Sequence, residues 1–395
     1  MTQVKKVYIV AAKRTAIGTF AGSLKDTSAI DLGVVVAKEL IKETRVSGST
    51  INEVIFGNVL SAGLGQNVAR QIAIKAGIPC ETPSYTVNKV CGSGLKAVQL
   101  ACQAIASGEA QVVLAGGTEN MNQAPYLVKG ARFGLRLNDS VMVDSMVKDG
   151  LWCAINDYHM GVTAENLAVK YGISRKEQDE FAALSHAKAI LAIAQGAFVR
   201  EIVAIPIRKQ KETTDFKVDE HPRPDSTLEK LSRLSPAFKK DGTVTAGNSS
   251  GINDGAAGLL LAGEEYVQEN NLVPLAEIIG FASAGVAPEI MGMGAAAALQ
   301  KVLQKTNMTL AGIDVFELNE AFAAQSLAVM KELKLDQEKV NVHGGAVALG
   351  HPIGASGARI MVTLLYAMQG CNAKTGLAAI CIGGGMGMAV IIKNI

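Results

Sequence analysis

The stretch VNKVCGSGLK, residues 87–96, places one cysteine, Cys91, between an apolar run typical of a strand and the start of a helical pattern. One apolar helix face is predicted by residues that recur at three- and four-residue steps: Leu95, Val98, Cys102 and Ile105. Gly108 provides the stop signal, because glycine tolerates the left-handed conformation that ends many helices. The stretch therefore predicts a strand, a glycine-rich turn and a helix.

Cys91 has a physical reason to be reactive at this position. The first turn of a helix carries unpaired N–H groups and a partial positive charge, which favour the thiolate over the thiol. A thiolate near neutral pH is a good nucleophile. The alternative is a small buried cysteine that packs the turn, because free cysteine is among the most buried residue types. The position alone leaves both interpretations open.

Length and composition indicate a large α/β protein without a nucleic-acid or membrane signature. At 395 residues the chain exceeds the roughly 250–300 residues that one core fills, so two or three domains are expected. A formal charge of +2 carries no nucleic-acid signature. The N-terminal stretch does not read as a signal peptide, and no apolar run approaches the ~18 residues of a membrane span. The six cysteines form no CxxC or metal-ligand spacing, which predicts free thiols, no metal site and a cytoplasmic location.

Hydrophobic patterns alternate between strands and helices along the chain. Strands are expected at residues 6–12, 54–60, 84–87, 111–115, 258–262, 275–281, 315–318, 377–382 and 388–392. Helices are expected after Cys91 and at residues 28–42, 65–76, 174–195, 295–304, 320–331 and 355–368. The helix from Ser174 opens with a capping box, Ser174-x-x-Glu177.

The middle of the chain differs from both ends. Residues 119–245 are more polar and contain the only tryptophan, Trp152. They are predicted to form an inserted loop domain. Residues 1–118, joined by about 246–270, are predicted to form one α/β half, and residues 271–395 the other. The segment TAGNSSGINDG, residues 245–255, is predicted to be a loop.

An internal repeat links the two ends. Apolar strands end in asparagine at residues 58 and 319, small-residue helix starts occur at 93 and 356, and strands run into glycines at 116 and 383. The offsets of 261, 263 and 267 residues are nearly constant, which suggests a duplicated α/β unit. If the halves pack about a pseudo-twofold axis, Cys91 meets the segment 351–356 and the turn after Cys381 near that axis.

Four segments resemble the signature motifs of thiolases. They are VCGSGLKA at 90–97, NEAFA at 319–323, GHPIGASGAR at 350–359 and CIGGGMG at 381–387. The similarity is collinear over essentially the whole chain. It implies two layered α/β halves with pseudo-twofold symmetry, an inserted loop domain and a homotetramer. It also favours a catalytic over a structural role for Cys91.

The resemblance implies a role for each matching residue. Cys91 would take an acyl group from acyl-CoA as a thioester, and His351 would activate its thiol. Cys381 would be the second acid/base, acting on the α-proton. Asn319, through a water, and His351 would bind one thioester oxygen, while the backbone N–H groups of Cys91 and Gly383 would bind the other.

The residues alone leave structural alternatives open. Asn319 could cap a helix that begins at Glu320, because asparagine is a favoured cap. His351 could be a hydrogen-bonded turn histidine, and Cys381 could be a core residue at the end of an apolar strand. The glycines that follow Cys381 do not match a dinucleotide-binding fingerprint, because a strand rather than a helix is predicted after them.

The same resemblance places coenzyme A. Arg223 would contact its nucleotide end and Ser250 its pantetheine, while His159, Met160 and Met291 would line the pantetheine and acyl pocket. Coenzyme A arrives on the substrate, so no separate cofactor is expected.

The triplet at residues 159–161, HMG, resembles the acetoacetyl-CoA branch of the family. We therefore expect condensation of two acetyl-CoA to acetoacetyl-CoA and CoA through acetyl-Cys91. The alternative is a 3-ketoacyl-CoA thiolase of β-oxidation with a broader chain length. A decarboxylating condensing enzyme would not need Cys381 as a base, and a non-catalytic acyl-CoA-binding relative would have lost a catalytic residue.

Overall fold

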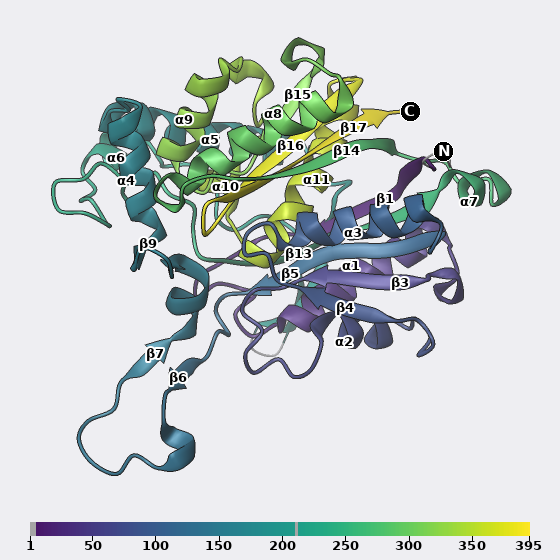
Figure 1. Cartoon of the computed structure of the whole chain (residues 1–395), viewed down its shortest axis with the longest axis horizontal. Coiled ribbons are helices and arrows are strands. Elements are labelled where there is room, and N and C mark those ends of the chain that lie inside the picture. Colours follow the sequence, from purple (N-terminus) through teal and green to yellow (C-terminus); the bar gives the residue numbers. More distant parts are fainter. Residues whose placement is uncertain (1–4, 210–211) are drawn as a thin grey trace.

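The computed structural model describes residues 5–209 and 212–395, and most of its strands join one mixed sheet (Figure 1). Along this sheet the strands follow the order β15 (Val315–Leu318), β16 (Thr375–Ile382), β17 (Met386–Asn394), β14 (Ala276–Gly285), β1 (Val7–Thr15), β13 (Asn253–Gly263), β5 (Val112–Asn120), β3 (Glu53–Gly57) and β4 (Ser84–Val87). Two short strands lie off this path, because β2 (Gly18–Thr19) pairs with β13 and β10 (Ile202–Val203) pairs with β1.

The sheet has two halves with the same strand order and the same strand directions. In the first half β3 is parallel to β5, while β5 with β13 and β13 with β1 are antiparallel. In the second half β15 is parallel to β16, while β16 with β17 and β17 with β14 are antiparallel. The halves meet where β1 pairs with β14 through Tyr8–Glu277 and Ile9–Ala276. This arrangement confirms the predicted duplicated unit with pseudo-twofold symmetry.

Helices cover both outer faces and fill the layer between the halves. Helices α1 (Ala29–Thr44) and α2 (Val68–Lys75) pack on the first half, and α8 (Gly294–Thr306) and α9 (Ala323–Leu333) pack on the second. Helices α3 (Ser93–Ser107) and α11 (Ile353–Gly370) lie between the halves, where they share one hydrophobic core with strands of both. Figure 1 shows the purple and blue first half below the green and yellow second half.

The two central helices cross where each carries a glycine. A Cβ on Gly94 would lie 2.8 Å from the backbone nitrogen of Ala358, and a Cβ on Gly357 would overlap the nitrogen of Leu95. Only glycine allows backbones to approach this closely. Gly94 and Gly357 are 263 positions apart, so equivalent residues of the repeat meet at the pseudo-twofold axis. The crossing brings the N-termini of both helices, and therefore Cys91 and His351, to one site.

Helix ends follow the signals in the sequence. Ser28 caps α1, and its side chain accepts a hydrogen bond from the Asp31 N–H. Helix α5 (Arg175–Ala194) begins with the predicted capping box of Ser174 and Glu177. These local motifs satisfy backbone donors that a helix N-terminus otherwise leaves free.

The glycine-rich segments form more strand than predicted. β5 continues through Gly116 and Gly117 to Asn120, and β13 begins at Asn253, inside the predicted loop. A Cβ on Gly116 would overlap the Ala257 carbonyl, so the glycines permit close pairing of these two strands. Long-range hydrogen bonding between β5 and β13 here outweighs the low strand propensity of Gly and Asn.

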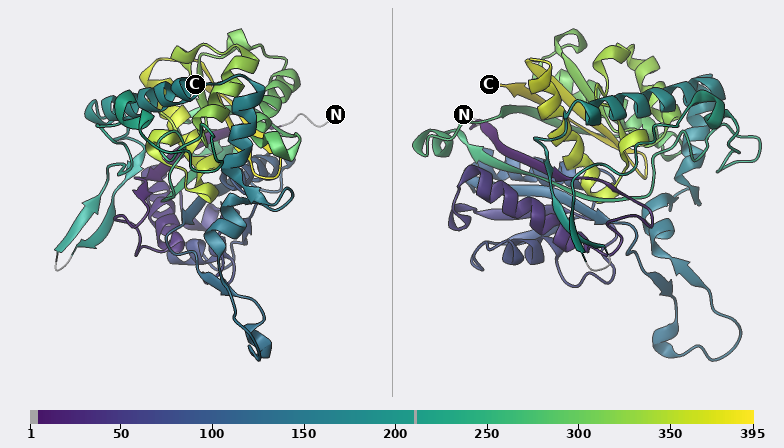
Figure 2. Two further views of the ribbon diagram at one scale, coloured as in Figure 1. Left: turned by 90° about the vertical axis from the view of Figure 1, so that its left-hand side faces the viewer. Right: turned by 180° about the vertical axis from the view of Figure 1, so that it is seen from behind.

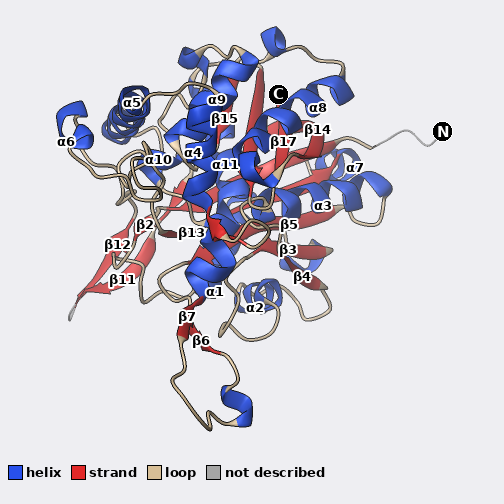
Figure 3. Ribbon diagram, turned by 60° about the vertical axis from the view of Figure 1, so that its left-hand side comes forward, coloured by secondary structure: helices blue, strands red, loops and turns tan. Residues whose placement is uncertain are grey.

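Most of residues 121–252 lie outside the large sheet. Their helices are α4 (Met160–Lys170), α5 and α6 (Leu228–Ser232), and their paired strands are β6 (Tyr126–Val128) with β7 (Met142–Asp144), β8 (Trp152–Cys153) with β9 (Tyr158–His159), and β11 (Ile205–Lys209) with β12 (Glu212–Phe216). The hairpins β6–β7 and β11–β12 project from the body as arms (Figures 2 and 3). The predicted bounds of the inserted domain stay a prediction.

Two further short helices are α7 (Glu264–Glu269) and α10 (Ala346–Leu349). Across the residues that the structure describes, no helix has both the length and the apolar character needed to cross a bilayer.

Candidate active site

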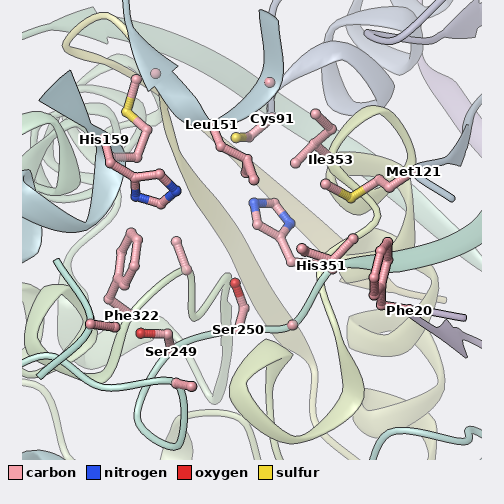
Figure 4. A pocket seen from close by; sticks show the side chains of 18 of the residues that line it. Phe20, Cys91, Met121, Leu151, His159, Ser249, Ser250, Phe322, His351 and Ile353 are labelled. Carbon is pink, nitrogen blue, oxygen red and sulfur yellow. The ribbon is translucent and has the colours of Figure 1, made fainter. Parts of the chain in front are cut away.

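A pocket of about 480 Å³ lies at the N-termini of α3 and α11 (Figure 4). Residues of both halves and of the 121–252 region line it. The predicted site residues on its wall are Cys91, His159, Met160, Arg223, Ser250, Met291, His351 and Gly383. The remaining two, Asn319 and Cys381, are buried next to His351 and Cys91. The fold therefore gathers all ten residues at one place.

A strained turn carries Cys91. Val90 has a φ of 47°, in the left-handed region that β-branched residues rarely adopt. The Asn88 side chain accepts a hydrogen bond from the Val90 N–H at 3.0 Å. Ser93 Oγ accepts one from the Lys89 N–H at 2.8 Å and donates one to the Val90 carbonyl at 2.6 Å. These bonds hold the turn in the conformation that directs Cys91 into the pocket, and such strain is characteristic of functional sites.

The Cys91 thiol is protonated in this environment. Burial raises the pKa of Cys91 to about 11, although the backbone N–H groups of Gly383 and Cys91 donate to the sulfur and act in the opposite direction. The prediction of a thiolate at the helix N-terminus is therefore wrong for the protein without substrate. Moving a charged sulfur out of water costs more free energy than hydrogen bonds from two N–H groups recover. Cys91 consequently needs a base.

His351 is a neutral imidazole with a defined tautomer. Its Nδ1 lies 2.6 Å from Ser356 Oγ, which donates its own proton to the Pro352 carbonyl at 2.9 Å. Nδ1 therefore carries the imidazole proton, and Nε2 is the basic nitrogen. Burial, together with the charge of Arg359, lowers the pKa of His351 to about 3. The ring is thus held as a proton acceptor at the pocket.

Asn319 contacts the basic side of this imidazole. Its Nδ2 lies 3.5 Å from His351 Nε2, and its N–H donates to the Ala379 carbonyl at 2.9 Å. Helix α9 begins only at Ala323, with Phe322 as its cap, so the alternative that Asn319 caps a helix is wrong. The buried Asn319 Oδ1 has no hydrogen-bond partner among the described residues, which leaves it available to a water or a ligand.

Cys381 lies close to Cys91 on the other side of the pocket wall. It is the next-to-last residue of β16, paired with Gly387 of β17, and its side chain is buried. Burial raises the pKa of Cys381, and the charge that Cys91 would carry as a thiolate raises it further. The core interpretation of Cys381 accounts for its burial but not for a second thiol beside the first.

Three aromatic rings form one side of the pocket, and two of them, Phe238 and Phe322, were not predicted as site residues. The His159 ring stacks on Phe238 with centroids 4.6 Å apart, and Phe238 meets Phe322 edge-on at 6.0 Å. Desolvation lowers the pKa of His159, so this ring is neutral. Phe322 lies in the motif at 319–323, whereas Phe238 has no signal in the sequence because its place depends on how a long loop folds.

Two further histidines support Arg223 at the pocket. The Arg223 N–H donates to His186 Nδ1 at 3.1 Å, and the neighbouring His221 ring lies 3.0 Å from the Ala348 carbonyl through Nδ1. His221 lines the pocket together with Arg223. A guanidinium at a pocket suits a phosphate-bearing ligand.

Comparisons with known protein families agree with this geometry. The model of the thiolase N-terminal domain matches residues 7–265, and that of the thiolase C-terminal domain matches residues 272–394. The chain belongs to the thiolase family.

Relatives of this thiolase cover its full length. The acetyl-CoA acetyltransferase of Escherichia coli (strain K12) is 56% identical over 99% of this chain and 100% of its own. A probable acetyl-CoA acyltransferase of Staphylococcus aureus (strain COL) is 56% identical over 98% and 99% of the two chains. The crystal structure of the Bacillus anthracis acetyl-CoA acetyltransferase superposes with a TM-score of 0.98 at 46% identity, covering 100% of both chains. The crystal structure of human mitochondrial 3-ketoacyl-CoA thiolase superposes with a TM-score of 0.97 at 45% identity, covering 99% of this chain and 100% of the other.

Proposed function

We propose that this thiolase is an acetyl-CoA C-acetyltransferase, which joins two acetyl-CoA into acetoacetyl-CoA and CoA through an acetyl group on Cys91. The observation that carries the proposal is the convergence of Cys91, the neutral base His351 and a second thiol, Cys381, on one pocket. Full-length relatives from Escherichia coli and Pseudomonas aeruginosa, at 56% and 55% identity, bear the name acetyl-CoA acetyltransferase.

In the first half-reaction Cys91 takes the acetyl group of acetyl-CoA. His351 Nε2 accepts the thiol proton while the sulfur attacks the carbonyl carbon, because a free thiolate is costly in this environment. The bond to the CoA sulfur then breaks, and His351 returns the proton to that sulfur. The backbone N–H groups of Cys91 and Gly383 stabilise the oxyanion that forms between these steps.

In the second half-reaction Cys381 passes its thiol proton to His351 Nε2 and, as a thiolate, takes a proton from the methyl carbon of a second acetyl-CoA. A thiolate whose pKa is raised by burial is a strong base, as this weak carbon acid requires. His351 and, through a water, Asn319 bind the enolate oxygen. The enolate carbon attacks acetyl-Cys91, the thioester bond breaks, and His351 returns its proton to the Cys91 sulfur, while Cys381 keeps the methyl proton as its thiol. The reverse sequence cleaves acetoacetyl-CoA with CoA.

The remaining pocket residues bind the substrate. Arg223 pairs with the nucleotide end of CoA, Ser250 contacts the pantetheine, and His159, Met160 and Met291 surround the acyl end. A ring at His159, stacked on an aromatic neighbour, shortens the space for an acyl chain. Coenzyme A is carried by the substrate, so the proposal includes no separate cofactor.

Thiolysis rates on acetoacetyl-CoA and on C8–C16 3-ketoacyl-CoA test this function. Activity confined to the C4 substrate is expected. Comparable activity on the longer chains would instead assign the protein to the 3-ketoacyl-CoA thiolases of β-oxidation. No activity on either, with Cys91 unreactive toward iodoacetamide, would overturn the proposal. A parallel assay with a malonyl thioester distinguishes a decarboxylating condensing enzyme.

We also propose a cytoplasmic homotetramer that serves lipid metabolism. The arm that includes β6 and β7 carries exposed apolar side chains, namely Phe133, Leu135, Leu137, Val141 and Met142. Exposed apolar groups on a projecting arm suit a contact between copies. Light scattering should give a tetramer for the native protein and smaller species after Phe133→Ser with Leu137→Ser, whereas a native monomer would contradict this assembly. The reducing cytoplasm keeps the proposed catalytic thiols free.

A further inference from the structure

The sheet register identifies an unexpected counterpart of Cys381. Gly57 of β3 pairs with Gly117 of β5, and Leu318 of β15 pairs with Ala379 of β16. Asn58 and Asn319 follow directly on Gly57 and Leu318, so they are equivalent. Two positions beyond Gly117 and Ala379 lie Glu119 and Cys381, 262 residues apart.

This register replaces the offset of 267 residues that the glycines suggested. The neighbouring strand of each half supports this equivalence. Glu119 pairs with a glycine of β13, Gly255, and Cys381 pairs with a glycine of β17, Gly387. The crossing of α3 and α11 pairs Gly94 with Gly357, which makes Gly354 the counterpart of Cys91. Each thiol of the active site therefore has a partner position across the pseudo-twofold axis.

Glu119 occupies its position as a buried, fully bonded carboxylate. Its Oε2 accepts hydrogen bonds from the N–H groups of Gly354 at 2.8 Å and Val59 at 3.0 Å. Its Oε1 accepts from the Leu60 N–H at 3.1 Å and from Asn58 Nδ2 at 2.8 Å. Four donors on two oxygens match the ionised form, in which both oxygens only accept hydrogen bonds.

The contact with Gly354 reaches the turn that carries His351. Gly354 lies in the first turn of α11, three residues after His351, and a Cβ there would lie 2.5 Å from Glu119 Oε2. An anion also suits the positive end of a helix. Ile353, between these residues, packs with Met121 beside the pocket (Figure 4). One carboxylate thus ties the N-terminus of α11 to the first half of the molecule.

We propose that Glu119 is a positioning residue, whose ionised carboxylate fixes the first turn of α11 so that His351 stays aligned with Cys91. This inference rests on the proposed thiolase reaction. The titratable groups that face Glu119 are Asp254 from β13 and Cys91 from the turn before α3. Burial and the charge of Asp254 raise the pKa of Glu119 to about 7. Protonation below that pH removes acceptor capacity, so kcat should fall as the pH drops through about 7.

The variant Glu119→Gln tests the assignment in acetoacetyl-CoA thiolysis. We expect kcat to fall about 30- to 100-fold with KM changed by less than about threefold, because alignment rather than binding is lost. The limb of the pH profile near pH 7 should disappear, since the amide does not titrate. His351 cannot produce that limb, because its pKa is lowered to about 3.

Asp254→Asn is the matched control. Asp254 is a buried neighbour that accepts hydrogen bonds from the N–H groups of Met121 and Asn122, with no bond to α11. Its variant should keep kcat within about threefold and retain the limb at a somewhat lower pH, because the repulsion that raises the Glu119 pKa is gone. An equal loss of kcat in both variants, or an unchanged limb in Glu119→Gln, would overturn the proposal.

Two further measurements keep the inference testable. If Glu119→Gln does not fold, Gly354→Ala breaks the same contact from the other side and should reduce kcat similarly. A native kcat in Gly354→Ala would refute the positioning role.

Alkylation of Cys91 by iodoacetamide needs no substrate, so it separates this inference from the proposed function. Loss of the Glu119 charge should lower the midpoint pH of this alkylation, since that charge raises the pKa of Cys91. An unchanged midpoint pH would contradict the electrostatic interaction between Glu119 and Cys91.

Discussion

The protein holds two versions of one arrangement, on either side of its pseudo-twofold axis. The catalytic set comprises Asn319, His351, Cys91 and Cys381. The counterpart set, at offsets of 261 to 263 residues, comprises Asn58, Asn88, Gly354 and Glu119. In the first set Cys91 and His351 face the pocket and Cys381 is buried close to Cys91, whereas in the second set Asn88 and Glu119 accept backbone N–H groups and Gly354 donates its N–H to Glu119. The same scaffold therefore supports reactivity on one side and rigidity on the other.

The two sets differ in the hydrogen bonding of their titratable groups. Glu119 tolerates a buried charge because four donors surround it. Burial instead raises the pKa values of Cys91 and Cys381, so both stay neutral without substrate. Both asparagines, Asn58 and Asn319, have a buried Oδ1 without a hydrogen-bond partner among the described residues, but only Asn319 lies next to the catalytic imidazole. The bonding of the titratable groups, and not that of the asparagines, therefore distinguishes the two sides.

Removal of the nucleophile should produce the largest effect. Cys91→Ala should reduce thiolysis about 10⁴-fold or more, because no other group on the wall of the pocket can form the thioester. Cys102→Ala, on the helix that follows Cys91, should keep the native rate. Wild-type turnover in Cys91→Ala would refute the mechanism.

Removal of the second thiol should separate the two half-reactions. Cys381→Ala should reduce overall turnover about 10³-fold, because the α-proton has no base. Transfer of acetyl from acetyl-CoA to Cys91 should remain within about tenfold of the native rate, which a rapid-quench experiment measures. Equal losses in both steps would show that Cys381 does not act on the α-proton.

Substitution of Asn319 should mainly lower activity, whereas substitution of its counterpart Asn58 should mainly lower stability. Asn319→Ala should lower kcat about 30- to 100-fold through loss of an enolate contact, with little change in Tm. Asn58→Ala should cost about 1–2 kcal/mol of stability, because its Nδ2 donates to Thr118 and Glu119, and should lower kcat less than about fivefold. The reverse pattern would reverse the assignment of the two sides.

The smallest effect is expected in the pH dependence of the Cys91 alkylation rate. With its pKa raised to about 11, the thiolate fraction grows with pH, so alkylation by iodoacetamide should accelerate about tenfold per unit between about pH 7 and pH 10. A plateau beginning near pH 7 would mean that the helix N-terminus, rather than burial, controls this thiol.

Local signals predicted much of the fold. The bounds of β15 match the pattern at 315–318, and the capping box at Ser174 predicted where α5 begins. The motifs around Cys91, Asn319, His351 and Cys381 were sufficient to predict that these residues meet. Such features depend on residues close in sequence or on the repeat, both of which the sequence displays directly.

Long-range pairing accounts for what was missed. β5 runs through Gly116 and Gly117 because β13 lies against them, and no local pattern shows that contact. The acidity of Cys91 depends on how deeply the folded chain buries it. The equivalence of Glu119 with Cys381 needed the register of two strand pairs, since matching glycines alone gave a shift of five residues.

Mass spectrometry of the protein after brief exposure to acetyl-CoA tests the central claim most directly. The account predicts one acetyl group on the peptide that contains Cys91, lost again when CoA is added. The peptides with Cys102 and Cys381 should remain unmodified. An acetyl group on Cys381 alone, or no acetylation at all in an active preparation, would contradict the assignment of Cys91 as the nucleophile.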